Sequence, residues 1–181
     1  MEPVRFPGKP ADTVGFRLED TFGENGTSFT PAHLGSRMTT LGLVVAEFNR
    51  PITEQMEHEA AEAAQAAGAE VHDIVHVPGV YDAPLAADRL ARLEAVDAVA
   101  VIGTVITGDT DHDQVISDAT AQRLADVSLE RDTPVTLGVT GPGMSAAESR
   151  ERIENAAKAV DSALDLVDEL PDPESPSRTT D

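Results

Sequence analysis

The sequence predicts an α/β fold, a three-layer α/β/α sandwich around a four-stranded parallel sheet. Four short segments rich in β-branched residues alternate with longer segments of helical periodicity, which is the pattern of repeated strand–helix units. Strands joined through helices pair in parallel and are covered on both faces, which explains why residues 41–46 and 98–102 are almost continuously apolar. With 181 residues and 40% hydrophobic content, the chain is large enough for one domain with a core.

The first two strand–helix units occupy residues 41–93. Residues 41–46 are an apolar run, as expected of a buried strand, and residues 53–67 are alanine-rich with a helical period. Asn49 can cap this helix, and Pro51 suits its first turn. Gly68 is well suited to end it. The second unit follows as a strand at 71–77, a turn at 78–82 and a helix at 83–93.

The last two units occupy residues 98–170. The third strand is expected at 98–106, because it begins with five consecutive small or β-branched apolar residues, and a helix at 113–129 follows. The fourth strand, at 134–140, is expected to end at the Gly-Pro-Gly of residues 141–143. Ser145 and Glu148 have the spacing of a capping box, so the last helix should run from there to about residue 170.

Outside residues 38–170 this pattern is lost. Residues 1–37 carry glycine, proline, threonine and charge without a lasting period. We expect them to be a disordered N-terminal extension, or the product of a start codon assigned too far upstream. Residues 171–181 are rich in proline and acidic residues, so a disordered tail is expected there. The folded domain is therefore expected at 38–170.

The chain is strongly acidic, with a net charge of −20 and an isoelectric point of about 4.4. It has no basic stripe, which argues against a nucleic-acid partner. No apolar run approaches the length of a membrane span and no signal peptide is visible, so we expect no membrane partner and a cytoplasmic location. The absence of cysteine excludes disulfides, thiolate metal sites and a cysteine nucleophile. Few lysines among so many acids predict a high-salt cytosol, and full stability in dilute buffer would contradict this.

Residues 103–112, Gly-Thr-Val-Ile-Thr-Gly-Asp-Thr-Asp-His, are the strongest functional motif. They lead from the apolar run at 98–102 to a helix, and the free N–H groups of a first helical turn attract anions. Gly108 lets the backbone approach a ligand, Thr110 supplies a hydroxyl, and His112 can titrate near neutral pH. The stretch therefore predicts a phosphate cradle beside a proton carrier, the alternative being an ordinary turn with a surface histidine.

Ligands in such sheets bind beyond the carboxyl ends of the strands, where Phe48 and Tyr81 are also expected. Two aromatic side chains at separate strand ends suggest a flat ring held by stacking, the alternative being ordinary packing. Asp82 can accept hydrogen bonds from a heterocycle, or it can cap a helix. The ordinary interpretation of Arg150 is a solvated side chain that pairs with Glu154 one turn later. No metal site is predicted, because the histidines at 72 and 76 have no third ligand near them.

Taken in order, Phe48-Asn49, residues 78–84, residues 103–112, Pro134-Val135 and Arg150 resemble the lumazine synthase family over residues 40–168. The resemblance implies a flavodoxin-like fold and a transferase of riboflavin biosynthesis. This enzyme condenses 5-amino-6-(D-ribitylamino)uracil with 3,4-dihydroxy-2-butanone 4-phosphate and needs no cofactor. It also implies a homo-oligomer, either a pentamer or a 60-subunit shell of pentamers, in which the end of the fourth strand and the last helix complete a neighbour's site.

The resemblance assigns a role to each matching residue. His112 matches the proton-transfer histidine, and Arg150 matches the arginine that pairs with phosphate. The remaining residues would bind substrate: Phe48 stacks on the pyrimidine; Val80, Tyr81 and Asp82 hold the uracil and ribityl groups; Thr104, Val105 and Ile106 line the ribityl side; Asp109 and Thr110 lie where the backbone binds phosphate; Leu137 stands where an aromatic usually covers the ring; and Lys158 falls at a second cation position.

Several positions depart from the family's pattern. One is Leu137, described above. In addition, Thr107 replaces a common arginine, Asp113-Gln114 replaces an aromatic–acid pair, and residues 156–160 lack a glycine-rich kink. Two alternatives stay open at this point: an archaeal-type riboflavin synthase, and a non-catalytic relative that binds flavin or forms a shell. The presence of His112 and Arg150 favours the lumazine synthase. The two acidic residues of the phosphate loop, Asp109 and Asp111, would have to point away from a bound phosphate.

Overall fold

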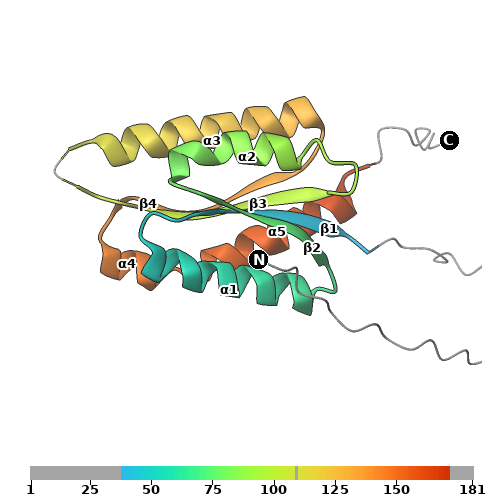
Figure 1. Cartoon of the computed structure of the whole chain (residues 1–181), viewed down its shortest axis with the longest axis horizontal. Helices are drawn as coiled ribbons and strands as arrows, with labels where there is room; N and C mark the ends of the chain where they lie inside the picture. The colour runs from blue at the N-terminus through green and yellow to red at the C-terminus, as the bar shows by residue number, and fades with distance from the viewer. Residues whose placement is uncertain (1–37, 109, 172–181) are drawn as a thin grey trace, which may run out of the picture. The chain divides into compact units, whose positions relative to one another are not determined.

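The computed structural model describes residues 38–108 and 110–171 (Figure 1). Within these ranges, four strands form one all-parallel sheet in the order β2-β1-β3-β4, which confirms the predicted sheet. The expectations for residues 1–37 and 172–181 lie outside the described residues. The strands are β1 (Thr40–Ala46), β2 (Glu70–Val77), β3 (Ala98–Ile106) and β4 (Val135–Met144).

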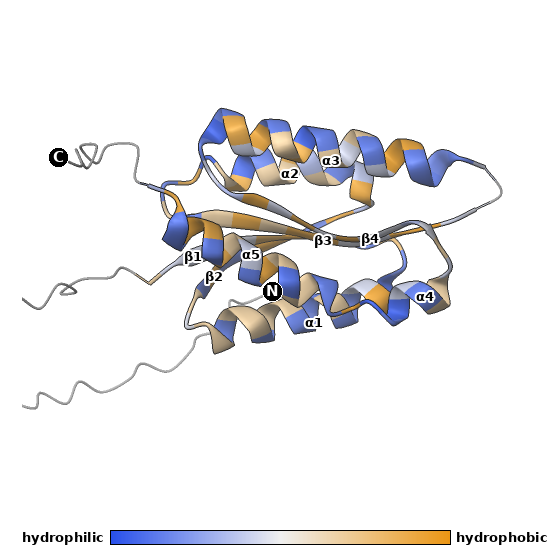
Figure 2. Ribbon diagram, turned by 180° about the vertical axis from the view of Figure 1, so that it is seen from behind, coloured by the Kyte–Doolittle hydropathy of each residue, from blue (hydrophilic) through white to orange (hydrophobic). Residues whose placement is uncertain are grey.

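Helices cover both faces of the sheet, so the three-layer sandwich is confirmed (Figure 1). Figure 2 shows that the strands are largely hydrophobic, whereas the helices alternate between hydrophobic and hydrophilic residues around their turns. No helix in the described ranges is long and apolar enough to cross a membrane. One face carries α1 (Arg50–Ala66), α4 (Ala146–Arg150) and α5 (Asn155–Glu169), and the other carries the short 3₁₀ helix η1 (Val80–Asp82), α2 (Ala83–Leu90) and α3 (His112–Arg131).

The side chains of the two central strands alternate between two apolar cores. Leu43 and Ile102 point toward α1 and α5, where Met56 is fully buried. Val44 points the other way, toward α2 and α3, and packs in a cluster with Leu124. Because both faces of β1 and β3 are sealed in this way, the ends of the strands are where a ligand can approach the sheet.

The observed helix and strand ends lie close to most of the predicted ones, and β3 has the predicted bounds. Gly68 follows α1 with a φ of +74°, the left-handed conformation expected of a glycine that ends a helix. The prediction that the Asn49 side chain caps α1 is wrong. Asn49 itself is left-handed, with φ 63°, and its side chain makes no capping hydrogen bond. The second helix is shorter than predicted, because α2 ends at Leu90.

The fourth strand does not end at the Gly-Pro-Gly segment as predicted. β4 continues to Met144, and its pairing with β3 jumps from Thr104 opposite Thr140 to Ile106 opposite Met144. The extra residues form a bulge in which Gly141 has a φ of +99° and Gly143 a φ of +77°. A Cβ at Gly141 would overlap the carbonyl of Val105, so only glycine fits there.

The predicted last helix is two helices. The capping box is present as expected, since Ser145 Oγ accepts a hydrogen bond from the Glu148 N–H and the Glu148 carboxylate accepts one from the Ser145 N–H. After α4, however, Arg152 N–H donates to the Ser149 carbonyl and Asn155 N–H to the Arg152 carbonyl, so i−3 bonds interrupt the helix. Glu154 pairs with Lys158, so the Arg150–Glu154 alternative is wrong.

Candidate active site

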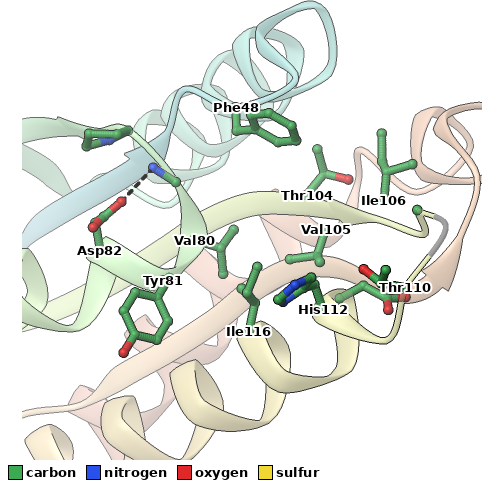
Figure 3. Close-up of a pocket in the computed structure, with 14 residues that line it drawn as sticks. Phe48, Val80, Tyr81, Asp82, Thr104, Val105, Ile106, Thr110, His112 and Ile116 are labelled. Atoms are coloured by element: carbon green, nitrogen blue, oxygen red, sulfur yellow. Dashed lines mark hydrogen bonds between the residues drawn. The ribbon is translucent and has the colours of Figure 1, made fainter.

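A cavity of about 430 Å³ opens at the carboxyl ends of β1, β2 and β3 (Figure 3). It exists because the central strands end at different levels. Val45 lies opposite Ile102, so β3 continues for four residues beyond this pairing while β1 ends after one. The overhanging end of β3 becomes a wall, and the segments that follow β1 and β2 close around it.

Of the four segments expected to gather here, those that follow β1, β2 and β3 line the cavity, and the Gly-Pro-Gly segment within β4 does not. Predicted site residues from three regions therefore come together, as Figure 3 shows, with Phe48 on one side and Val80, Ile116 and His112 on the other. Asp109 lies outside the described residues. The predicted residues that line the cavity are Phe48, Val80, Tyr81, Asp82, Thr104, Val105, Ile106, Thr110 and His112.

The two aromatic side chains are not part of the core of this chain, so they do not pack inside it. Phe48 is 67% exposed and Tyr81 is 65% exposed, yet both line the cavity. A large apolar ring left in water beside a cavity can gain free energy by stacking on a flat ligand. Val80 between them is buried, with 4% exposed, and forms the apolar floor.

Asp82 caps a turn, but not the one that the sequence suggested. Its carboxylate accepts a hydrogen bond from the Gly79 N–H at 3.1 Å, which closes η1, and it makes no capping hydrogen bond to α2 (Figure 3). Residues 79–82 are therefore held in one conformation by the chain itself. The side chain remains exposed and lines the cavity, so it keeps acceptor capacity for a ligand.

His112 is the first residue of α3 and is exposed at the cavity, near Ile116 and Thr110 (Figure 3). Among the described residues that line the cavity, it is the one basic side chain. Ile116 was missed in the sequence, although it lies one helical turn after His112 and so shares its face. Asp111 is exposed.

Asp113, the second residue of α3, was also missed as a site residue. Its Oδ2 accepts hydrogen bonds from Thr107 Oγ1 at 2.9 Å and from the Gly143 N–H at 3.1 Å. The Gly143 N–H has the largest effect in lowering the pKa of this carboxyl below its ordinary value, followed by the Thr107 hydroxyl, with smaller effects from the N–H groups of Gln114 and of Asp113 itself. A buried carboxylate of the chain thus lies in the first turn of the helix where an anion was expected to bind.

Three predicted residues lie away from the cavity. Leu137, on the edge strand β4, is 49% exposed, and it lines a separate pocket of about 350 Å³ together with Lys158 of α5. Arg150, the last residue of α4, is exposed and forms no ion pair with any residue in the described ranges. Its neighbour Ser149 is fully buried and accepts a hydrogen bond of 3.0 Å from Thr104, a residue of the cavity wall.

Comparison with known proteins gives a consistent result. The family model described as 6,7-dimethyl-8-ribityllumazine synthase matches residues 38–170. A protein of that name from Halobacterium salinarum is 68% identical over 133 residues, covering 74% of this chain and 100% of the relative. Its namesake from Halorubrum lacusprofundi is 62% identical over 74% of this chain and 99% of the relative. The protein of the same name from Methanocaldococcus jannaschii is 46% identical, covering 74% of this chain and 94% of the relative.

Proposed function

Because the chain belongs to the 6,7-dimethyl-8-ribityllumazine synthase family, we propose that it is the transferase that makes this lumazine in riboflavin biosynthesis. It condenses 5-amino-6-(D-ribitylamino)uracil with 3,4-dihydroxy-2-butanone 4-phosphate, and phosphate and water are released. The observation that carries the proposal is the cavity, in which two exposed aromatic rings and a carboxylate face a helix that begins with a histidine.

The aminouracil binds between the ends of β1 and β2. Phe48 stacks on the pyrimidine ring, since its exposed face can bury apolar area only against a ligand or a partner. One oxygen of Asp82 is held by the Gly79 N–H, and the other is free to accept an N–H of the heterocycle. The ribityl chain extends along Thr104, Val105 and Ile106 at the end of β3.

His112 moves the protons of the reaction. Imine formation, phosphate loss and ring closure each transfer a proton, and an imidazole can accept and return protons near neutral pH. His112 lines the cavity beside the end of β3, which is where the second substrate must meet the aminouracil. Holding the two substrates side by side supplies a further part of the rate.

The phosphate is neutralised by a neighbouring subunit in this proposal. The described residues contribute no arginine or lysine to the cavity, and a phosphate dianion needs more positive charge than one histidine supplies. Arg150 is exposed and has no ion pair with another described residue, and Leu137 and Lys158 lie on the edge strand and on the last helix. A homopentamer would bring these three side chains to the cavity of the next subunit, with a 60-subunit shell as the larger assembly.

The test is to mix the two substrates with the full chain in high salt and to follow lumazine absorbance and phosphate release. Arg150→Ala should weaken use of the phosphorylated substrate by about 2–4 kcal/mol, as for the loss of one member of a desolvated charge pair. Arg152→Ala is the matched control, because Arg152 is exposed two residues away and its side chain donates, among the described residues, only to the Glu148 carbonyl. Equal KM and kcat values for Arg150→Ala and the wild type would refute this role.

A second arm of the assay separates this function from that of a riboflavin synthase. The chain is given lumazine alone, and the expected result is no riboflavin. Formation of riboflavin in this arm, with no condensation in the first, would overturn the proposal. Flavin binding without either reaction would identify a non-catalytic relative instead.

A further inference from the structure

Asp113 is the one side chain with a formal charge that is buried among the described residues, with 7% exposed. Its neighbours in sequence, His112 and Gln114, are both exposed. Burying a carboxylate is unfavourable unless hydrogen bonds satisfy it. The contacts of this carboxylate therefore indicate what its burial achieves.

The carboxylate joins three segments that are separate in the chain. Thr107 follows β3 and donates its hydroxyl to Asp113, while Gly143 in the bulge of β4 donates its N–H to the same oxygen. The Thr107 N–H also donates to the Met144 carbonyl at 2.9 Å. Four residues thus form a closed set of hydrogen bonds that ties the end of β3 and the bulge of β4 to the first turn of α3.

This set lies directly beside the proton-transfer residue. His112 precedes Asp113, and both line the cavity. The end of β3, near the carboxylate, provides the wall that would hold the ribityl chain. The hydrogen bonds of the Asp113 carboxylate therefore fix the position of both this wall and His112. A displacement of about 1 Å at a reacting group can lower a rate by about 10²-fold, so fixing this geometry matters for catalysis.

We propose that Asp113 is a positioning residue, whose carboxylate holds the first turn of α3 so that His112 reaches the reacting atoms in the cavity. This inference rests on the proposed function. Asp113 does not itself transfer protons, because all its hydrogen-bond partners are donors and keep it ionised. Arg150 and the aromatic residues bind substrate through other segments, so their contribution is separate.

The test compares Asp113→Asn with Asp118→Asn in the full chain at high salt. Asp118 is an exposed carboxylate on the same helix, so its replacement changes the charge equally. Asp113→Asn should lower kcat about 10-fold or more and leave lumazine binding, measured by fluorescence, within about twofold, because Phe48 and Tyr81 are held by other segments. Thr107→Val removes one hydrogen-bond donor to the Asp113 carboxylate by changing an exposed residue, and it should lower kcat by a smaller factor. This variant keeps the test valid if Asp113→Asn folds poorly.

Measuring Asp113→Asn in a chain that already carries His112→Ala distinguishes a positioning role from a merely structural one. If Asp113 acts through His112, Asp113→Asn should lower kcat by less than about twofold once His112 is absent. Two results would overturn the inference while the proposed function stood. One is a double variant whose loss of kcat equals the product of the losses in Asp113→Asn and His112→Ala, and the other is an equal kcat for Asp113→Asn and Asp118→Asn. An inactive wild type would overturn the proposed function. The imidazole NMR signals of His112, assigned with His112→Ala, test the positioning separately: they should shift in Asp113→Asn and Thr107→Val, and unchanged signals would contradict the inference.

Discussion

Replacing Gly103 by alanine tests whether the floor of the cavity is as closely packed as the structure indicates. Gly103 lies within β3, and a Cβ built there would come 2.7 Å from Val80 Cγ2 and 3.1 Å from Ala46 Cβ. Carbon atoms in good contact are about 3.5–4.0 Å apart, so η1 would have to move by roughly 1 Å. The expected loss is about 1–3 kcal/mol of unfolding free energy, the range for an overpacked core.

The same geometry predicts a compensating change. Val80→Ala removes the methyl group that meets the new Cβ, and alone it should destabilise the fold by leaving a small cavity. In the double variant the added methyl partly fills that cavity, so the loss should be smaller than the sum of the two single losses. Gly108→Ala is the control: apart from its chain neighbours, no atom of the described residues lies within 4 Å of a Cβ built there, and its effect should stay within about 0.5 kcal/mol.

Denaturant unfolding at constant high salt measures these differences. Two results would refute the reasoning: additive losses for Gly103→Ala and Val80→Ala, or a Gly103→Ala variant as stable as Gly108→Ala. Activity gives a parallel test, because η1 carries Tyr81 and Asp82. If Gly103→Ala displaces η1, the KM for the aminouracil should rise, and Val80→Ala should partly restore it.

Three further predictions concern protons, buried hydroxyls and acid. His112→Ala should lower kcat by about 10²-fold or less, and an unchanged pH–rate profile would contradict its role. Thr104→Val and Ser149→Ala should each cost about 1–3 kcal/mol in unfolding free energy, since each leaves a buried hydroxyl unpaired, and the double variant should cost less than their sum. Arg131, the largest cause, holds the pKa of Asp88 below its ordinary value. The stability that this pair contributes is present when the pH is above the ordinary pKa of Asp88, and it is lost as the pH falls through the lowered pKa. Arg131→Gln should therefore weaken the pH dependence of acid unfolding.

The sheet could be predicted because its signals are local. Each strand is a short segment rich in β-branched residues, and the third segment alone gives the bounds of β3. The break between α4 and α5 could not be predicted, because no glycine or proline marks it. It accompanies two contacts with distant strands: Ser149 bonds to Thr104 in β3, while a Cβ at Gly138 of β4 would lie 2.9 Å from Ala159. The bulge of β4 likewise depends on Val105 across the sheet.

The candidate site divides in the same way. Phe48, Tyr81 and His112 could be placed together from sequence, because parallel strands bring their carboxyl ends to one edge. The role of Asp113 could not, since its partner Gly143 lies 30 residues away and the contact requires the bulge. The helix start seemed available for an anion from its sequence, whereas the structure places a buried carboxylate, Asp113, in its first turn.

Charge decides how a phosphorylated substrate can bind to such a chain. The described part of the cavity wall holds two carboxylates, Asp82 and Asp113, and one histidine, within a molecule of net charge −20. In the proposed assembly the missing positive charge is the neighbour's Arg150, so phosphate affinity and subunit association depend on each other. Subunits that each carry this charge repel one another, and only screening by salt brings them close. High salt would therefore complete the site as well as stabilise the fold.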